Sequence, residues 1–456
     1  MEEKKARLTF CAGVGTVTGA NFLLEVAGLK ILVDCGLVQS SKMADDINWD
    51  PFTYDAKTID VLFITHAHVD HIGRIPKLIS EGFQGRIIST IPTKDITALM
   101  LEDTAGILKS DYEYGLDKIY TADNIKRAIS LWETHEYRTS INLAPNLDFY
   151  FKDSGHILGS AIIEITAFGK KIVFTGDLGN SPSPILPDTE KVTDADYMVI
   201  ESVYGDRNHE SRDERKKRLE AIIEDNYKRG GALVIPTFSL ERSQELLFEI
   251  NDFVENERIP KMPIYFDSPL GIKLTDIYAR YKSYFNKNAQ DVIKSGDDIF
   301  KFPGLRITLS TDESKQIVKE PNPKIILAGS GMSSGGRVVH HEHNYLPDPN
   351  NTLLLIGYQS MGTLGRHIED GAKTVRISGQ EVSVRAHIEK ISGYSGHKDA
   401  DHLVEFVEAT SETVKQIFVT MGEPKSSFSL AQRLRDYIGV NAITPELGSS
   451  VELDLN

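Results

Sequence analysis

The sequence predicts an α/β protein of two or three domains, and three observations support this. The chain has 456 residues, which is too long for one compact core. Its apolar runs are short and end abruptly in polar or glycine-containing turns, a pattern typical of buried strands whose tips carry function. In the middle of the chain a strand pattern is followed at once by a helix pattern, which is the unit of a parallel sheet.

The strand-like runs in the first half of the chain share a second property, because each ends in a carboxylate or an imidazole. These runs cover residues 29–34, 61–66, 171–177 and 197–201. Side chains that can bind metals or move protons are thus expected at several strand tips.

Two other stretches have helical patterns. Residues 95–140 are largely polar, with Trp132 and single aliphatic residues spaced for amphipathic packing, so we expect a helical insertion there. A charged helix should begin at residues 212–218, ahead of a buried strand at 232–235 and apolar residues at helical spacing over 246–254.

Two further strands, 324–328 and 352–357, continue this strand-and-helix pattern. We therefore predict a second α/β domain at residues 206–370. It is inserted into a first domain that is formed by residues 1–205 and 371–456.

Composition gives the class of protein. Hydrophobic residues make up 40% of the chain and charged residues 26%, which are ordinary values for a globular protein. No charged-then-apolar signal opens the sequence, and no apolar stretch approaches the ~18 residues that a membrane span requires. We expect a soluble, cytoplasmic protein without a membrane partner.

The net charge and the cysteines limit the kinds of site. A charge of −15 argues against a broad basic surface for nucleic acid, so any binding of phosphate must be local to a cleft. Cys11 and Cys35 are the only cysteines, too few for a disulfide framework or a cysteine zinc site. We expect both to be small buried apolar residues.

The most informative motif, His-x-His-x-Asp-His, comes directly after a predicted strand and contains His66, His68, Asp70 and His71. Two residues spaced two apart on an extended turn can aim both imidazoles at one point. Asp70 and His71 can face a second point nearby. Imidazole and carboxylate are the ligands of catalytic zinc sites that keep a position open for water, so we interpret the motif as a metal site.

One motif cannot complete two coordination spheres, so further ligands must come from distant strand tips. The candidates are His156, Asp177 and His397, each next to glycine or serine residues that let the backbone approach an ion. Asp34, at another strand tip, is placed to orient a ligand or the bound water.

These residues resemble the metallo-β-lactamase superfamily, and more narrowly its β-CASP branch of RNA and DNA nucleases. Glu201 in Glu-Ser-Val-Tyr-Gly-Asp-Arg, His367 in Gly-Thr-Leu-Gly-Arg-His and His397 in Ser-Gly-His match that branch's three additional motifs. The similarity covers nearly the whole chain and is greatest to short prokaryotic ribonucleases related to the cleavage and polyadenylation endonuclease. A histidine in the third motif favours the RNA-cutting members.

The resemblance implies a fold and a set of metal ligands. The fold would be a metallo-β-lactamase αββα sandwich with an inserted β-CASP domain built on a parallel sheet. One zinc ion would be held by His66, His68 and His156, and a second by Asp70, His71 and His397, with Asp177 bridging the pair. Manganese or iron could occupy similar ligands.

The activity implied is hydrolysis of single-stranded RNA by a hydroxide held between the two zinc ions, leaving 5′-phosphate and 3′-hydroxyl ends. His367 would donate a proton to the leaving oxygen and Glu201 would hold His367 in place. A homodimer is expected from relatives, and DNA is a less favoured substrate. Endonuclease and 5′-to-3′ exonuclease action both stay open.

A glycine-rich turn in the second domain is a candidate phosphate site. Its backbone amides, including that of Gly331, the hydroxyls of Ser330, Ser333 and Ser334, and Arg337 could contact phosphates. A simple helix-starting loop is an equally good interpretation.

Two other functions fit parts of the pattern. The same scaffold supports hydrolysis of small molecules such as thioesters, although such an enzyme would not need the inserted domain. A non-catalytic RNA-processing subunit is the third interpretation, but such proteins commonly lose metal ligands, whereas all seven expected positions are filled here.

Overall fold

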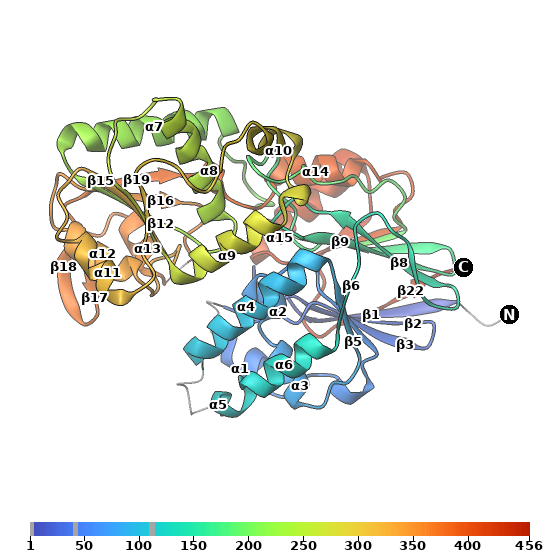
Figure 1. Cartoon of the computed structure of the whole chain (residues 1–456). Coiled ribbons are helices and arrows are strands. Elements are labelled where there is room, and N and C mark those ends of the chain that lie inside the picture. Colours follow the sequence, from blue (N-terminus) through green and yellow to red (C-terminus); the bar gives the residue numbers. More distant parts are fainter. Residues whose placement is uncertain (1–3, 40–43, 109–114, 361) are drawn as a thin grey trace. The chain divides into compact units, whose positions relative to one another are not determined.

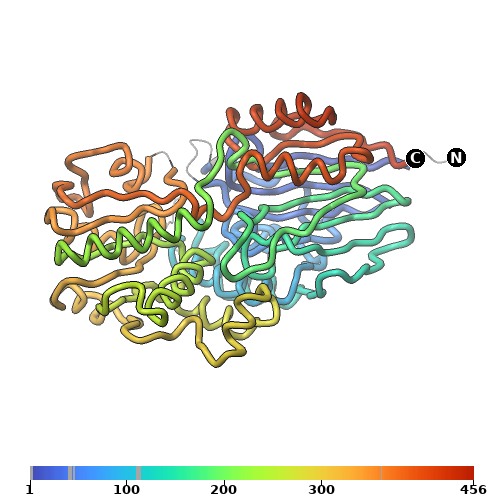
Figure 2. Tube along the Cα trace, turned by 90° about the horizontal axis from the view of Figure 1, so that it is seen from above, coloured from blue at the N-terminus to red at the C-terminus, as the bar shows by residue number. Residues whose placement is uncertain are grey.

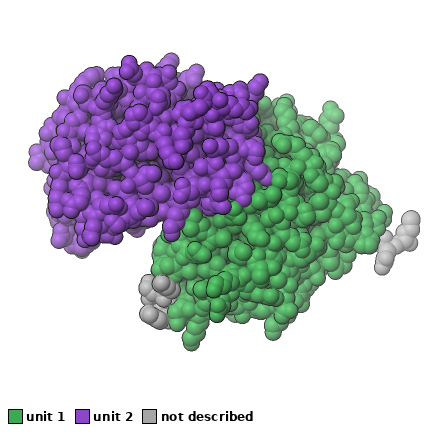
Figure 3. All heavy atoms as spheres, in the orientation of Figure 1, with its two compact units in different colours: residues 1–181, 188–208, 397–456 green, residues 182–187, 209–396 purple. Residues whose placement is uncertain are grey.

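The computed structural model describes residues 4–39, 44–108, 115–360 and 362–456. The chain divides into two compact units, which Figure 3 colours separately. Unit 1 consists of residues 1–181, 188–208 and 397–456, and unit 2 of residues 182–187 and 209–396.

Unit 1 is built on two seven-stranded sheets. The strands of the first, in spatial order, are β22 (Ser450–Asp454), β1 (Lys5–Ala12), β2 (Asn21–Val26), β3 (Leu29–Val33), β4 (Val61–Phe63), β5 (Arg86–Ser89) and β6 (Trp132–Thr134). Those of the second are β21 (Ala442–Ile443), β20 (Gln416–Val419), β11 (Tyr197–Ile200), β10 (Lys170–Phe174), β9 (Ala161–Ala167), β8 (Leu147–Asp153) and β7 (Ile141–Ala144). Pairing of β1 with β22 brings the two ends of the chain together, as Figures 1 and 2 show.

Aromatic side chains from the two sheets form the core between them. Phe63 on β4 meets Phe149 on β8 with ring centroids 4.9 Å apart, and Phe10 on β1 meets Phe418 on β20 at 5.3 Å. Strands β4 and β20 are buried on both faces, so other elements must cover their outer faces.

Helices complete the four layers of unit 1. The outer face of the second sheet packs on α14 (Ala400–Glu408) and α15 (Pro424–Arg433), whose Leu403, Phe406 and Leu430 join the buried cluster of that face. The first sheet is flanked by α3 (Ile75–Ser80), α4 (Ile91–Leu108) and α6 (Ala122–Ser130), in blue and cyan in Figure 1. The predicted αββα sandwich is confirmed.

Smaller elements connect these layers in unit 1. They are α1 (Ala44–Trp49), η1 (Ala56–Thr58), α2 (Val69–Ile72), α5 (Leu116–Ile119) and η4 (Leu434–Ile438).

Unit 2 contains a six-stranded sheet in which every described pair is parallel. Its strands, in spatial order, are β14 (Leu305–Ile307), β13 (Ile264–Asp267), β15 (Lys324–Ala328), β12 (Ala232–Pro236), β16 (Thr352–Ile356) and β19 (His387–Ile391). One face packs on α11 (Thr311–Ile317), α12 (Val338–Tyr345), α13 (Leu364–Glu369) and the hairpin of β17 (Thr374–Ile377) and β18 (Gln380–Ser383).

The other elements of unit 2 include two long helices, α7 (Arg212–Arg229) and α8 (Arg242–Glu255), on the opposite face of the sheet (Figure 1). The remaining ones are α9 (Pro269–Arg280), η2 (Lys282–Tyr284), α10 (Lys287–Lys294) and η3 (Ser392–Tyr394). Ser211 begins α7 with a capping box to Glu214, which explains why the charged run at 212–218 is helical.

Two expectations differ from the structure. The stretch 95–140 is not helical throughout, because Trp132 lies in strand β6, where its indole N–H donates to Ser89 Oγ at 2.8 Å. Unit 2 also extends beyond the predicted segment 206–370, because β19 pairs with β16 and the chain returns to unit 1 only at residue 397.

Among the residues that the structure describes, no helix is long and apolar enough to cross a membrane.

Candidate metal centre

The candidate ligands of unit 1 follow the ends of neighbouring strands. Asp34 comes directly after β3, and His66 follows β4 closely. In the second sheet, Asp177 follows β10 and Glu201 comes directly after β11. Because β3 and β4 are parallel, and β10 and β11 are parallel, each pair of side chains leaves its sheet at one edge.

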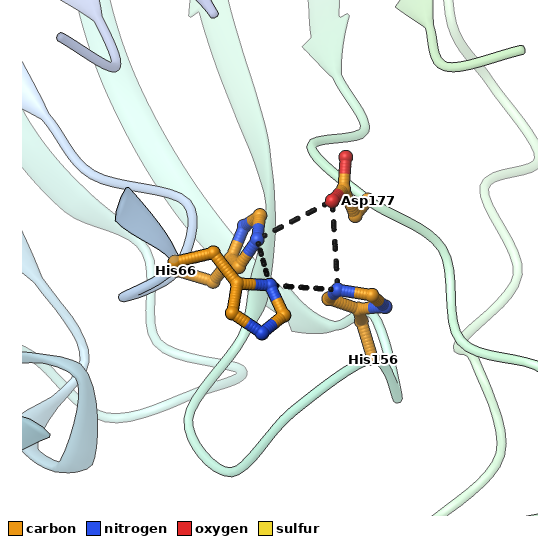
Figure 4. A group of neighbouring side chains, drawn as sticks. His66, His156 and Asp177 are labelled. Atoms are coloured by element: carbon orange, nitrogen blue, oxygen red, sulfur yellow. Dashed lines mark hydrogen bonds and ion pairs between the residues drawn. The ribbon is translucent and has the colours of Figure 1, made fainter. Parts of the chain in front are cut away.

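One group of four donors has the geometry of a zinc site, and Figure 4 shows three of them, His66, His156 and Asp177, converging. His68 Nδ1 lies 3.1 Å from both His66 Nε2 and His156 Nε2. Asp177 Oδ2 lies 3.4 Å from His66 Nε2 and 3.5 Å from His156 Nε2. A tetrahedral zinc ion with bonds of ~2.0–2.1 Å requires donor atoms about 3.4 Å apart, so the group fits zinc.

The protonation states of these histidines also suit a metal. Burial lowers the pKa of His66, with a further decrease from His71, and lowers the pKa values of His68 and His156 well below the ordinary value. Three neutral imidazoles each keep one ring nitrogen without a proton, and the lone pairs of these nitrogens can bind one cation. A bound cation satisfies these lone pairs.

His71 is oriented by a carboxylate behind it. Asp34 Oδ2 lies 2.7 Å from His71 Nδ1, and the other oxygen of Asp34 accepts the backbone N–H of Thr65 at 2.8 Å. The Thr65 hydroxyl donates to Asp34 at 2.8 Å as well. Since an ionised carboxylate only accepts hydrogen bonds, His71 Nδ1 carries a proton and the other ring nitrogen, Nε2, is the one that can bind a metal.

The atoms in front of His71 provide a test of whether a cation fits. His71 Nε2 and Asp177 Oδ1 are buried, face each other at 3.4 Å, and have no hydrogen-bond partner among the residues that the structure describes. Burial alone would lower the pKa of His71, but the carboxylates of Asp177 and Asp34 raise it well above the ordinary value. A positive charge is therefore required at this point, and either a proton or a metal ion can provide it.

Asp70 completes this second group. Its Oδ2 lies 3.9 Å from His71 Nε2, and Asp70, His71 and Asp177 form a set of possible ligands. Asp177 also belongs to the group of His66, His68 and His156. A carboxylate common to both groups is what a bridging ligand between two ions requires.

His397 enters the centre next to Glu201. Its Nδ1 lies 3.2 and 3.1 Å from the two carboxylate oxygens of Glu201 and 3.9 Å from Asp177 Oδ2. Burial opposes protonation of His397, but Glu201 and Asp177 outweigh it and raise its pKa to about 9. Glu201, 1% exposed, also accepts the backbone N–H of Leu178 at 2.6 Å.

Within unit 1 the Glu201 carboxylate accepts from His397 and from the backbone N–H of Leu178. Its expected role of holding His367 stays a prediction. His367 lies in unit 2, exposed on α13. Its role as a proton donor stays a prediction.

A loop between β8 and β9 presents His156, and sequence reasoning assigned no role to its organising residue, Ser160. The Ser160 hydroxyl accepts the backbone N–H groups of His156 at 3.1 Å and Ile157 at 3.2 Å. Thr90 and Thr93 hold the same loop by donating to the carbonyl of Gly159 at 2.6 and 2.8 Å. The only signal in the sequence was a serine after glycine, close to a candidate ligand.

The glycine-rich turn of unit 2 contains the five candidate phosphate ligands. Arg337 donates to Asp267 and to the carbonyl groups of Thr308 and Leu309, so its guanidinium is occupied by protein acceptors. The buried Ser333 hydroxyl donates to Glu342. Ser334 is exposed and Ser330 partly exposed, so these two hydroxyls are better placed for a phosphate than the buried Gly331.

Three family models match consecutive parts of the chain. The metallo-beta-lactamase superfamily domain matches residues 23–199, and the Beta-Casp domain matches residues 243–368. The Zn-dependent metallo-hydrolase RNA specificity domain matches residues 381–445.

Curated relatives align over almost the whole chain. It is 34% identical over 418 residues to ribonuclease TTHA0252 of Thermus thermophilus, covering 92% of this chain and 93% of that protein. It is 30% identical over 451 residues to the transcription termination factor FttA of Methanosarcina mazei, covering 94% of this chain and 69% of that protein.

A crystal structure of a protein of unknown function from Enterococcus faecalis V583 has a similar fold, with a TM-score of 0.59 and 12% identity over 98% of this chain and all of that chain. With the fold, the donor groups and the match to a relative at 34% identity, the chain belongs to the β-CASP ribonuclease branch of the metallo-β-lactamase superfamily.

Proposed function

We propose that the protein is a metal-dependent ribonuclease that hydrolyses phosphodiester bonds of single-stranded RNA with two zinc ions. The observation that carries the proposal is that six proposed ligands lie around a seventh, Asp177, the one residue that is shared by all the candidate ligand groups among the described residues. The relative named as a ribonuclease supports RNA as the substrate.

In this proposal the ligands divide between two ions. His66, His68 and His156 would hold one, Asp70, His71 and His397 would hold the other, and Asp177 would be a ligand of both. Two bound divalent cations would lower the pKa of a shared water and offset the negative charge of the phosphate. They would thereby supply the positive charge that a chain with a net charge of −15 lacks overall.

The side chains behind the ligands keep this geometry in place. Asp34 and Thr65 fix the ring of His71 with Nε2 facing Asp177. Glu201 accepts from Nδ1 of His397, which leaves Nε2 of that ring for a metal. Neither Asp34 nor Glu201 has to touch the RNA to affect the rate.

The proposed reaction is an in-line displacement at phosphorus. An activated water attacks the phosphorus while the bond to the 3′ oxygen breaks, so the products carry a 5′-phosphate and a 3′-hydroxyl. The departing oxygen needs a proton, and His367 is the proposed donor. In the metal-free protein, the positive charge that the two ions would supply comes instead from protonated His71 and His397.

The test is cleavage of end-labelled single-stranded RNA by zinc-loaded protein. His68→Ala and Asp177→Ala should each lower the rate by at least ~1000-fold, because each removes a ligand of the centre. His387→Ala, which removes an exposed histidine of β19, should leave the rate unchanged. Wild-type cleavage by either ligand variant would overturn the proposal.

Three further measurements test the product ends, the homodimer and the small-molecule alternative. Phosphatase treatment of the products identifies the end that carries the phosphate. Sedimentation velocity tests the homodimer that is expected from relatives. Hydrolysis of a thioester without any cleavage of RNA would favour the small-molecule alternative.

A further inference from the structure

Thr65 lies directly before His66 in unit 1, and its hydroxyl contacts three side chains of the metal centre. Thr65 Oγ1 lies 2.8 Å from Asp34 Oδ2, 3.1 Å from His66 Nδ1 and 3.3 Å from His71 Nδ1. The residue is 1% exposed, so water does not compete for these contacts. Because a hydroxyl donates only one hydrogen bond, its proton can serve only one of the three partners.

The His66 ring has one nitrogen that faces the other donors of the first group. This atom, Nε2, lies 3.1 Å from His68 Nδ1 and 3.4 Å from Asp177 Oδ2. Nε2 is therefore the nitrogen that would bind a metal, and Nδ1 carries the ring proton. Within the described part of the chain, the Thr65 hydroxyl is the one hydrogen-bond partner of Nδ1.

The direction of the hydrogen bonds at Thr65 follows from these protons. His66 Nδ1–H donates to Thr65 Oγ1. His71 Nδ1–H donates to Asp34 Oδ2 at 2.7 Å, which is a shorter contact than its 3.3 Å to Thr65. Neither Nδ1 atom can accept, because both carry protons, so the Thr65 hydroxyl donates to Asp34.

Asp34 is thereby connected to one histidine of each candidate ligand group. His71 donates to it directly, and His66 reaches it through the Thr65 hydroxyl. The two histidines belong to different groups that share Asp177. One carboxylate and one hydroxyl thus orient an imidazole in both groups.

Packing around Thr65 fixes the position of its hydroxyl. Its backbone N–H donates to Asp34 Oδ1 at 2.8 Å, and its carbonyl accepts from Ala161 N–H at 2.8 Å. A Cβ on Gly176 would lie 2.7 Å from Thr65 Cβ and 2.9 Å from Oγ1, so the backbone of Gly176 packs directly against this side chain. A β-branched side chain has few χ1 angles to choose from, and the hydroxyl is a fixed acceptor.

We propose that Thr65 is a positioning residue of the metal centre, which orients His66 for one ion and, through Asp34, steadies His71 for the other. The inference rests on the proposed function, because it takes His66 and His71 as ligands of different ions. Thr65 acts through the two imidazoles and the carboxylate, without a bond of its own to a metal or to the RNA.

The first test measures zinc affinity at both sites by competition with a chromophoric chelator. Thr65→Val has nearly the same shape without the hydroxyl, and it should weaken the site of His66 by about 10–100-fold and the other site by a smaller factor. Thr65→Ser restores the hydroxyl and should recover most of the affinity at both sites. His68→Ala identifies the site of His66, because that is the site it removes.

Thr97→Val is the matched control for the loss of a buried hydroxyl. Thr97 is a buried threonine of α4 in the same unit, and its hydroxyl has no hydrogen-bond partner among the residues that the structure describes. The substitution therefore removes the same group without removing a hydrogen bond. Both zinc affinities should equal those of the wild type.

A spectroscopic measurement separates positioning from a general loss of stability. Long-range proton–nitrogen correlation spectra of the metal-free protein show which ring nitrogen of a histidine carries the proton, and His66→Ala assigns the signals of His66. We expect the proton on Nδ1 in the wild type, Thr65→Ser and Thr97→Val. In Thr65→Val the population should shift toward a proton on Nε2, which can donate to Asp177.

Wild-type zinc affinity at both sites in Thr65→Val would overturn the inference, and so would a Thr65→Ser variant that binds as weakly as Thr65→Val. If Thr65→Val does not fold, the wild-type spectrum decides alone, since a proton on Nε2 of His66 contradicts the bond to Thr65. If His68→Ala keeps both zinc ions, the proposed metal centre is itself wrong. Loss of one ion in His68→Ala with unchanged affinities in Thr65→Val contradicts only the role of Thr65.

Discussion

At the scale of single residues, the strongest argument comes from the two ring nitrogens of His71. Asp34 accepts a hydrogen bond from Nδ1–H, which leaves Nε2 facing Asp177 Oδ1 at 3.4 Å. Two such groups, buried and without hydrogen-bond partners in the described part of the chain, are costly unless a positive charge lies beside them. The orientation of one imidazole thus depends on a carboxylate that never touches a metal.

Asp34→Asn should therefore weaken zinc binding by about 10–100-fold, because the amide cannot accept from both Thr65 and His71 in the same way. Equilibrium zinc titration measures the effect. Asp60→Asn, which changes a carboxylate that accepts the backbone N–H of Lys30, is the control. Equal affinities for the wild type and Asp34→Asn would contradict the assigned tautomer.

A second buried carboxylate, that of Asp267 in unit 2, contributes to the stability of the folded protein. Burial alone would raise its pKa, but hydrogen bonds from His341, Ser314, Thr308 and Arg337 outweigh burial and lower the pKa to about 2. Because the folded-state pKa lies below the ordinary value, the stabilisation is fully present above pH ~4 and is lost as the pH falls toward 2.

Asp267→Asn should lower the free energy of unfolding at pH 7 by about 3–5 kcal/mol, since it leaves Arg337 and His341 without their carboxylate. About 2 kcal/mol of that difference should disappear between pH 5 and pH 2. Urea unfolding of both proteins across this range provides the measurement. Asp370→Asn, at an exposed ion pair, should change little. A pH-independent difference would show that Asp267 is not held ionised.

At the scale of elements, the loop between β8 and β9 shows how local backbone contacts create a ligand position. Gly155 and Gly159 have φ values of 68° and 84°, and Asp153 accepts the backbone N–H of Gly155 at 2.8 Å. Ser160 then closes the loop by accepting the N–H of His156. His156 is held by its own loop as well as by its packing in the centre.

Ser160→Ala should reduce zinc affinity by roughly tenfold, because two buried backbone N–H groups lose their acceptor and the loop loosens. Ser80→Ala, which removes a hydroxyl that bonds a helix carbonyl far from this loop, should have no effect on zinc binding. If Ser160→Ala binds zinc as tightly as the wild type, the loop is held mainly by Thr90 and Thr93.

The strands were the elements that the sequence predicted best. The runs at 29–34, 171–177 and 197–201 correspond to β3, β10 and β11, because short apolar runs bounded by turns usually form buried strands. Strand β6 was missed, since Trp132 follows a helix of similar composition and its pairing with β5 is not visible locally. The pairing with β5 in the folded protein, and not the local sequence, makes this segment a strand.

At the scale of the whole molecule, the centre depends on residues that are far apart in the sequence. The sequence could name these residues as candidates, because the motif at His66 to His71 demands further ligands and few candidates have glycine neighbours. The contact between Glu201 and His397 could not be predicted, because 196 positions separate them and only the packing of β11 beside the Gly179 bridge brings them together.

The most direct test of the metal centre is anomalous diffraction at the zinc edge from crystals of the zinc-loaded protein. We expect two peaks on either side of Asp177, one bonded to His66, His68 and His156 and the other to Asp70, His71 and His397. A zinc-loaded crystal without a peak at Asp177, or with its peaks elsewhere in the chain, would contradict this account.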